Sequence, residues 1–94
     1  MITHEKIVEA INKVAPEYNI TKASYFGSYA EGNAKEDSDL DVLVEFIEDT
    51  VSLFDIIGVQ LALEEELGIP VDVLHAPLPE DAWIEINKEV PVYG

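Results

Sequence analysis

Apolar residues recur at helical spacing in two segments of the chain, residues 4–15 and residues 52–67. Each pattern predicts a helix, since apolar positions three and four residues apart share one helical face. Thr3 stands just before the first segment and Ser52 begins the second, and both have the side chains typical of helix N-caps. Pro16 should end the first helix, because a residue that precedes proline avoids the helical conformation. A glycine after Leu67 should end the second helix.

Three further segments, residues 21–27, 39–46 and 71–75, have the composition of strands. A turn-rich connection with one short helical turn is expected over residues 29–38, a short helix over residues 79–88, and an extended tail after it. In the middle strand a period of two separates two faces, one with Leu40, Val42, Val44 and Phe46, the other with Asp39, Asp41, Leu43 and Glu45. The order of elements predicts an α/β (α+β) fold, a small mixed three-stranded sheet with helices packed on one face.

Length and composition favour a single small domain over residues 1–94. The apolar fraction is 48%, which suits a compact globule and excludes a disordered chain. There is no cysteine, so disulfides and thiolate metal sites are excluded. No apolar run reaches the length of about 18 residues that a membrane helix needs, and the first residues lack the apolar core of a signal peptide. We therefore expect a soluble, cytoplasmic protein.

The charge balance narrows the choice of partners. The chain has 20 acidic residues against 5 lysines and no arginine, a formal net charge of −15. Such a field repels nucleic acid, whose binding normally uses several Lys or Arg contacts to phosphates. The acidic surface is explained either by solubility or by a basic protein or divalent cation as partner.

The sharpest chemical feature is the pair Asp39 and Asp41 at the start of a predicted core strand. Alternation places both carboxylates on one side of the strand, where they repel each other unless a cation lies between them. Mg²⁺ is the usual occupant of such an all-oxygen site. Asp72, between valines in another predicted strand, would complete a set of three carboxylates if the two strands pair. The alternatives are an exposed turn for the Asp pair and a strand-edge acid facing water for Asp72.

Gly27 and Ser28 follow the first predicted strand. Glycine lets the backbone approach an anion closely, and a serine hydroxyl with the following N–H groups can bind phosphate oxygens. An ordinary strand-terminating turn explains the same two residues.

Taken together, these motifs carry a family resemblance. Gly27-Ser28, the ten residues Tyr29–Ser38, and then Asp39-Leu40-Asp41 resemble the signature of the polymerase-beta-type nucleotidyltransferase superfamily. Val71-Asp72-Val73 is similar to its third-carboxylate strand, and the chain as a whole resembles the minimal nucleotidyltransferase (MNT) branch.

The resemblance implies roles for these residues. Gly27 and Ser28 would grip the phosphates of a nucleoside triphosphate such as ATP, and Asp39 and Asp41 would hold two Mg²⁺ ions. Asp72 would bind the metal that activates the attacking hydroxyl. It also implies a partner: MNT proteins are often paired with a helical HEPN-family toxin RNase and act as its antitoxin by transferring AMP to a toxin tyrosine.

One position departs from the family pattern. Many relatives carry arginine where this chain has Glu31, which cannot neutralise a phosphate, and Lys35 is the basic residue in the same connection. Outside the motifs, we interpret the aromatic residues Tyr25, Phe26, Phe54 and Trp83 as core residues. We interpret His4 as a surface residue at the start of a helix, His75 as a structural histidine and Ser38 as a turn residue. The remaining acidic run, Glu64, Glu65 and Glu66, is interpreted as a solvated helix face.

Three hypotheses of function follow. The first is an enzyme that transfers a nucleoside monophosphate to a hydroxyl acceptor, with a protein side chain favoured over nucleic acid. The second is a non-catalytic antitoxin that masks its partner by contact alone. A third, transfer to a small molecule, is disfavoured because such enzymes usually need a further domain to hold the acceptor. Homo-oligomers are compatible with each of them.

Overall fold

The computed structural model describes residues 2–47, 51–76 and 88–94. Helix α1 spans His4–Val14, and the Thr3 hydroxyl caps it by accepting a hydrogen bond from the Lys6 N–H at 3.2 Å. Beyond α1 the chain tightens into a 3₁₀ turn, η1 (Ala15–Tyr18), which contains Pro16. The predicted start and end of this helix are therefore confirmed, and proline does change the helix type where the sequence indicated.

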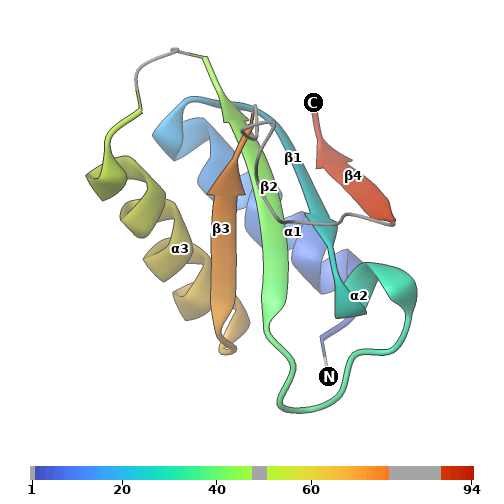
Figure 1. Ribbon diagram of the computed structural model, residues 1–94. Coiled ribbons are helices and arrows are strands. Elements are labelled where there is room, and N and C mark those ends of the chain that lie inside the picture. The colour runs from blue at the N-terminus through green and yellow to red at the C-terminus, as the bar shows by residue number, and fades with distance from the viewer. Residues whose placement is uncertain (1, 48–50, 77–87) are drawn as a thin grey trace.

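Four strands form one mixed sheet. They are β1 (Ile20–Phe26), β2 (Leu40–Phe46), β3 (Val71–His75) and β4 (Glu89–Tyr93), in the order β3-β2-β1-β4. The pairs β1–β2 and β1–β4 are antiparallel, whereas β2 and β3 are parallel. The parallel pair requires a crossover connection, which the second long helix supplies (Figure 1).

That crossover helix, α3, spans Leu53–Leu67. Its first turn is held by a capping box, in which the Ser52 hydroxyl accepts from the Asp55 N–H and the Asp55 carboxylate accepts from the Ser52 N–H. Gly68 ends the helix in the left-handed conformation with φ +71°. The single turn α2 (Ser28–Glu31) is the short helical turn expected after the first strand.

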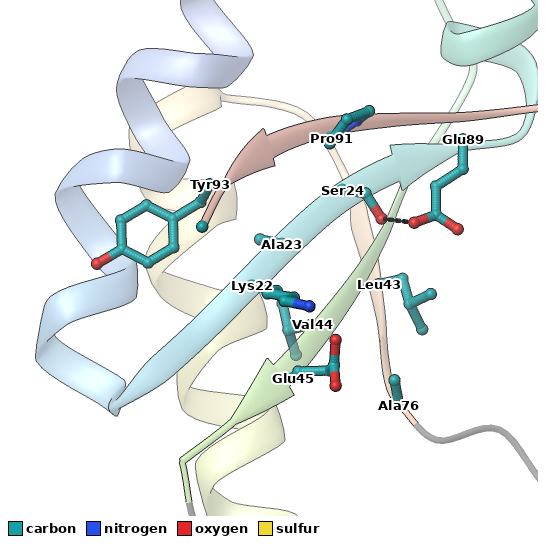
Figure 2. Close-up of a pocket in the computed structure, with 11 residues that line it drawn as sticks. Lys22, Ala23, Ser24, Leu43, Val44, Glu45, Ala76, Glu89, Pro91 and Tyr93 are labelled. Atoms are coloured by element: carbon teal, nitrogen blue, oxygen red, sulfur yellow. Dashed lines mark hydrogen bonds between the residues drawn. The ribbon is translucent and has the colours of Figure 1, made fainter.

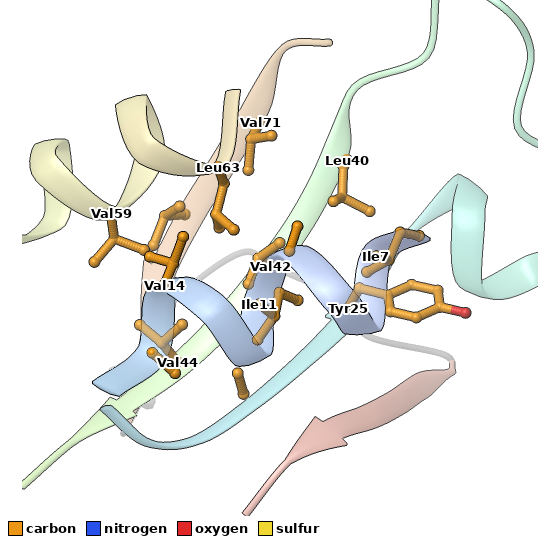
Figure 3. Close-up of a cluster of buried hydrophobic side chains, with 14 of the residues drawn as sticks. Ile7, Ile11, Val14, Tyr25, Leu40, Val42, Val44, Val59, Leu63 and Val71 are labelled. Carbon is orange, nitrogen blue, oxygen red and sulfur yellow. The ribbon is translucent and has the colours of Figure 1, made fainter. Parts of the chain in front are cut away.

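Helices α1 and α3 cover one face of the sheet, as predicted (Figure 1). The core lies between them and that face, and Figure 3 shows side chains from both helices meeting those of β2 and β3. Its fully buried large residues are Ile7, Leu40, Leu63, Val42, Val44, Val59 and Val71. Burying a side chain of this kind stabilises the fold by about 1.5–3 kcal/mol, so the β2 alternation fixes which face of that strand points inward.

The fold class is confirmed, but the expected number of strands was too small. The segment expected to be only an extended tail pairs with β1 as a fourth strand. Pro91 has no backbone N–H to donate, but β4 lies at an edge of the sheet, where a missing N–H disrupts no further ladder. Asn12 of α1 donates to the Val92 carbonyl at 3.1 Å and ties this strand to the helical layer. The structure does not describe residues 77–87, so almost all of the helix predicted over residues 79–88 lies outside the described part of the chain.

One face of α3 is apolar and exposed. Leu53, Phe54, Ile57 and Leu61 are between 41% and 86% exposed, with Phe54 the most exposed. The interpretation of Phe54 as a core aromatic is therefore wrong, because the helix turns toward the core the face that carries Val59, Leu63 and Leu67. Within the described residues, no helix is both long enough and apolar enough to cross a membrane.

Candidate active site

Two of the three predicted carboxylates lie side by side on the sheet. Asp41 and Asp72 are direct partners in the parallel register of β2 and β3, and Phe26 of β1 is the partner of Asp41 on its other side. Adjacent strands are about 4.8 Å apart, so both carboxylates start from neighbouring positions. They lie on the face of the sheet that the helices leave open, since Leu40 and Val42 on either side of Asp41 are buried in the core. The pairing of these two strands, which sequence reasoning could only suppose, is confirmed.

Gly27 is fitted closely against Asp41. It follows β1 with φ +74° and ψ −150°, a conformation that side-chain-bearing residues rarely adopt. A Cβ placed on Gly27 would lie under 3.0 Å from Asp41 Oδ2 and 3.2 Å from its Cγ. The absence of a side chain at this position therefore lets the Asp41 carboxylate lie over the backbone where α2 begins.

The same surroundings affect the ionisation of Asp41. Partial burial raises the pKa of this carboxyl above its usual range, and the nearby charges of Asp72 and Asp39 raise it further. Burial disfavours a charge that water would otherwise solvate, and like charges disfavour it again. The site thus concentrates negative charge where the described residues supply little positive charge to balance it.

Asp39 is placed differently from the other two carboxylates. It precedes β2 and is exposed. The turn before it is closed by Ser38, whose hydroxyl accepts from the Lys35 N–H at 2.8 Å and whose own N–H donates to the Lys35 carbonyl at 3.0 Å. Ser38 is therefore a turn residue, as predicted, and it fixes the backbone immediately before Asp39.

The donor set suits Mg²⁺, although the described residues contain no ready-made group of three or more His, Asp or Glu ligands. Mg²⁺ is commonly held by one or two carboxylates together with substrate phosphates and water, so an all-protein cage is not required. Asp41 and Asp72, adjacent and on the open face, supply such a pair, with Asp39 two residues before Asp41.

The phosphate-binding candidates lie beside this pair. Ser28 opens α2, and Gly27 precedes it as the N-cap residue, with the Glu31 N–H donating to the Gly27 carbonyl at 3.0 Å. Glu31 and Lys35 are both exposed. The structure therefore brings Gly27 next to Asp41 and leaves Lys35 on the connection between α2 and β2.

Sequence reasoning missed the role of Glu64. It was assigned to a solvated helix face, but its carboxylate accepts the Val71 N–H at 3.0 Å. The Leu40 N–H donates to the Pro70 carbonyl at 3.1 Å beside it. These two bonds fix the start of β3 one residue before Asp72, and no local pattern in the sequence signals them.

The mixed sheet, the neighbouring acidic residues of β2 and β3, and the Gly-Ser turn after β1 match the arrangement expected of a nucleotidyltransferase. The nucleotidyltransferase domain family matches residues 4–91. The chain belongs to this family and is a nucleotidyltransferase. It is 42% identical over 71 residues to the protein adenylyltransferase MntA of Thermococcus cleftensis, a match that covers 74% of this chain and 71% of that protein.

Solved structures agree on the fold. A toxin–antitoxin structure with AMP-PNP superposes with a TM-score of 0.78 at 20% identity, covering 93% of this chain and 73% of that one. A tri-AMPylated Shewanella oneidensis HEPN toxin in complex with an MNT antitoxin gives a TM-score of 0.72 at 17% identity, covering 98% and 73%. The resemblance to the minimal nucleotidyltransferase branch is confirmed by the family match and by the MntA relative.

Proposed function

We propose that this protein is a single-domain, Mg²⁺-dependent, cytoplasmic protein adenylyltransferase that moves AMP from ATP to a hydroxyl of a partner protein. The observation that carries the proposal is the pairing of Asp41 with Asp72 beside Gly27 on the open face of the sheet. The activity named for the Thermococcus relative supports AMP as the transferred group.

In this proposal each residue has a distinct task. The backbone at Gly27 and the hydroxyl of Ser28 bind the triphosphate, whose terminal phosphates leave as pyrophosphate. Asp72, exposed on the edge strand β3, orients the incoming hydroxyl. The hydroxyl oxygen bonds to the α-phosphorus, the bond to pyrophosphate breaks, and the hydroxyl proton passes to water. Most of the rate acceleration would come from positioning and charge stabilisation.

Asp39, Asp41 and Asp72 would hold two Mg²⁺ ions, which neutralise the charge that develops on the phosphoryl oxygens. The chain contains no arginine and its Lys35 is exposed, so the described part of the site has little cationic charge of its own for that purpose. We therefore expect transfer to depend strictly on a divalent cation.

The proposed acceptor is a tyrosine of a helical HEPN-family toxin, which makes this chain its antitoxin. The complex of an AMPylated HEPN toxin with an MNT antitoxin supports this partner. The net charge of −15 also favours a protein acceptor over a nucleic acid.

The test is labelling with α-phosphate-labelled ATP and Mg²⁺ in the presence of the protein encoded by the adjacent reading frame, the position where we expect a HEPN-family partner. Asp41→Asn should lower covalent labelling by about a hundredfold or more, as for the loss of a main electrostatic stabiliser. Its melting temperature should not fall, because the change removes a charge that faces Asp72. Asp37→Asn, an exposed acid in the preceding turn, is the matched control. Equal labelling by Asp41→Asn and wild type would sink the proposal.

The exposed apolar face of α3 favours a second function, masking of the partner by contact alone. Phe54 is 86% exposed and Leu53 69%, and exposed apolar residues gathered on one face mark a site of interaction. If Asp41→Asn neutralises the toxin as well as wild type does, whereas Phe54→Ser does not, contact accounts for the antitoxin effect. If Asp41→Asn fails to neutralise the toxin whereas Phe54→Ser still does, catalysis accounts for the antitoxin effect.

A further inference from the structure

A cavity on the open face of the sheet adjoins the carboxylate pair. Its volume is about 270 Å³, and it is lined by β1, β2 and β4, including Lys22, Ser24, Leu43, Glu45 and Glu89 (Figure 2). Ser24 and Leu43 are register partners, two residues along their strands from Phe26 and Asp41. The nearest part of the cavity floor is therefore about 7 Å from Asp41, on the same face.

The sheet register also relates this cavity to the proposed catalytic residues. Glu89, Phe26, Asp41 and Asp72 form one row across β4, β1, β2 and β3. The row extends from Asp72 at one edge of the sheet to Glu89 at the other. In the proposed reaction the triphosphate lies toward Gly27 and the acceptor hydroxyl toward Asp72. The nucleoside would then occupy the remaining part of the open face, where the cavity lies.

The chemistry of the cavity suits a base better than a phosphate. Two carboxylates, Glu45 and Glu89, line it against one lysine, so a polyanion would be repelled. Leu43, half-buried on the open face, offers an apolar surface for a flat ring. The cavity thus offers one apolar surface, Leu43, among lining groups that are mostly polar, and such groups can orient a base by hydrogen bonds.

Ser24 and Glu89 form the one hydrogen bond between side chains among the described residues that line the cavity. Ser24 is 5% exposed, and its hydroxyl donates to Glu89 Oε2 at 2.7 Å (Figure 2). Because the serine proton is committed to the carboxylate, both partners present lone pairs to the cavity, and Oε1 of Glu89 makes no hydrogen bond within the described residues. Such a pair accepts hydrogen bonds and offers none.

We propose that this cavity is the nucleoside pocket, and that Glu89, held by Ser24, selects a base that carries an exocyclic amine, such as adenine. The inference rests on the proposed nucleotidyl transfer and adds the residue that reads the base. An amine donates to Glu89 Oε1, whereas a base with a carbonyl or hydrogen at that position leaves the carboxylate without a partner.

The experiment compares the binding of ATP, inosine triphosphate and purine riboside triphosphate to the full chain by titration calorimetry with Mg²⁺. Wild type should prefer ATP to purine riboside triphosphate by about ten- to a hundredfold, the range for a hydrogen bond to a charged group. Glu89→Gln should reduce that preference to within about threefold and improve binding of inosine triphosphate, since the amide can donate to a carbonyl. Ser24→Ala, which frees the Glu89 side chain, should give an intermediate preference.

Glu9→Gln is the control, because it removes one negative charge from the exposed face of α1, away from the sheet. Unchanged base preference in both Glu89→Gln and Ser24→Ala, with circular dichroism showing folded protein, would overturn the inference. In that case AMP transfer would continue and the proposed function would stand. Failure of the wild-type chain to bind any of the three nucleotides would refute the proposed function, and this inference with it.

Discussion

Replacing Gly27 by alanine perturbs the candidate site through one methyl group. The backbone at this residue has φ +74° and ψ −150°, a region that glycine occupies almost alone. The added Cβ would lie under 3.0 Å from Asp41 Oδ2, whereas ordinary contacts begin at 3.4 Å. Either the Asp41 carboxylate moves aside or the backbone before α2 changes its path.

Both responses have a calculable consequence. A residue other than glycine in this backbone region costs about 1–3 kcal/mol. For a domain of this length each 1 kcal/mol lowers the melting temperature by about 4–8 °C, so we expect a decrease of roughly 4 to 24 °C. Displacement of a catalytic group by about 1 Å can lower the rate a hundredfold, so activity should fall far more than stability does.

Gly32→Ala separates strain from contact. Gly32 also has a positive φ, +79°, but a Cβ there would meet nothing within 4 Å. That variant should lose about 1–2 kcal/mol of stability and keep its activity. Melting curves by circular dichroism and AMP transfer measured well below both melting temperatures provide the comparison. A Gly27→Ala protein that transfers AMP at the wild-type rate would refute the argument that this glycine makes room for Asp41.

Three further predictions concern stability. Burial, and then the charge of Glu5, raise the pKa of Tyr25 above its usual value of 10.0. The folded state therefore keeps the tyrosine proton to a higher pH than the unfolded chain does, so the unfolding free energy should fall as the pH rises above about 10. In urea unfolding between about pH 8 and 11, this fall should be smaller for Tyr25→Phe than for wild type. Ser52→Ala should lower the unfolding free energy by about 1 kcal/mol through loss of the α3 cap, and no change in thermal unfolding would contradict the capping role. Glu64→Ala leaves the Val71 N–H without its acceptor, so it should lower the unfolding free energy by about 1.5–3 kcal/mol and speed amide exchange at Val71. Glu65→Ala, at an exposed position, should change neither the unfolding free energy nor the exchange rate.

Local patterns were sufficient to predict most elements of the fold. The 3.6-residue period identified α1 and α3, and the period of two identified β2 and its buried face, because each pattern reflects burial against a single neighbouring layer. The strand β4 was missed because Pro91 is compatible with a strand only at a sheet edge, and position within the sheet is set by tertiary pairing.

The candidate site was predictable only in part, for a similar reason. The motif identified Asp39, Asp41 and Asp72 as residue types, but the parallel register that sets Asp41 opposite Asp72 depends on how α3 packs. The close approach of Gly27 to Asp41 and the bond from Val71 to Glu64 are contacts between different elements. Phe54 was misassigned because an aromatic residue in an apolar helix gives no indication of which face meets the core.

The parallel pairing of β2 with β3 links ligand binding to the folding of the whole chain. Asp41 and Asp72 become neighbours only after α3 has crossed over and docked, so an intermediate that lacks this helix contains at most the half of the site carried by β1 and β2. A nucleotide that binds there would select the fully folded state. At a hundred times its dissociation constant it would raise the unfolding free energy by about 2.7 kcal/mol. For a domain this small, such a gain is a large share of total stability, and the cellular lifetime of the protein would then depend on the supply of its own substrate.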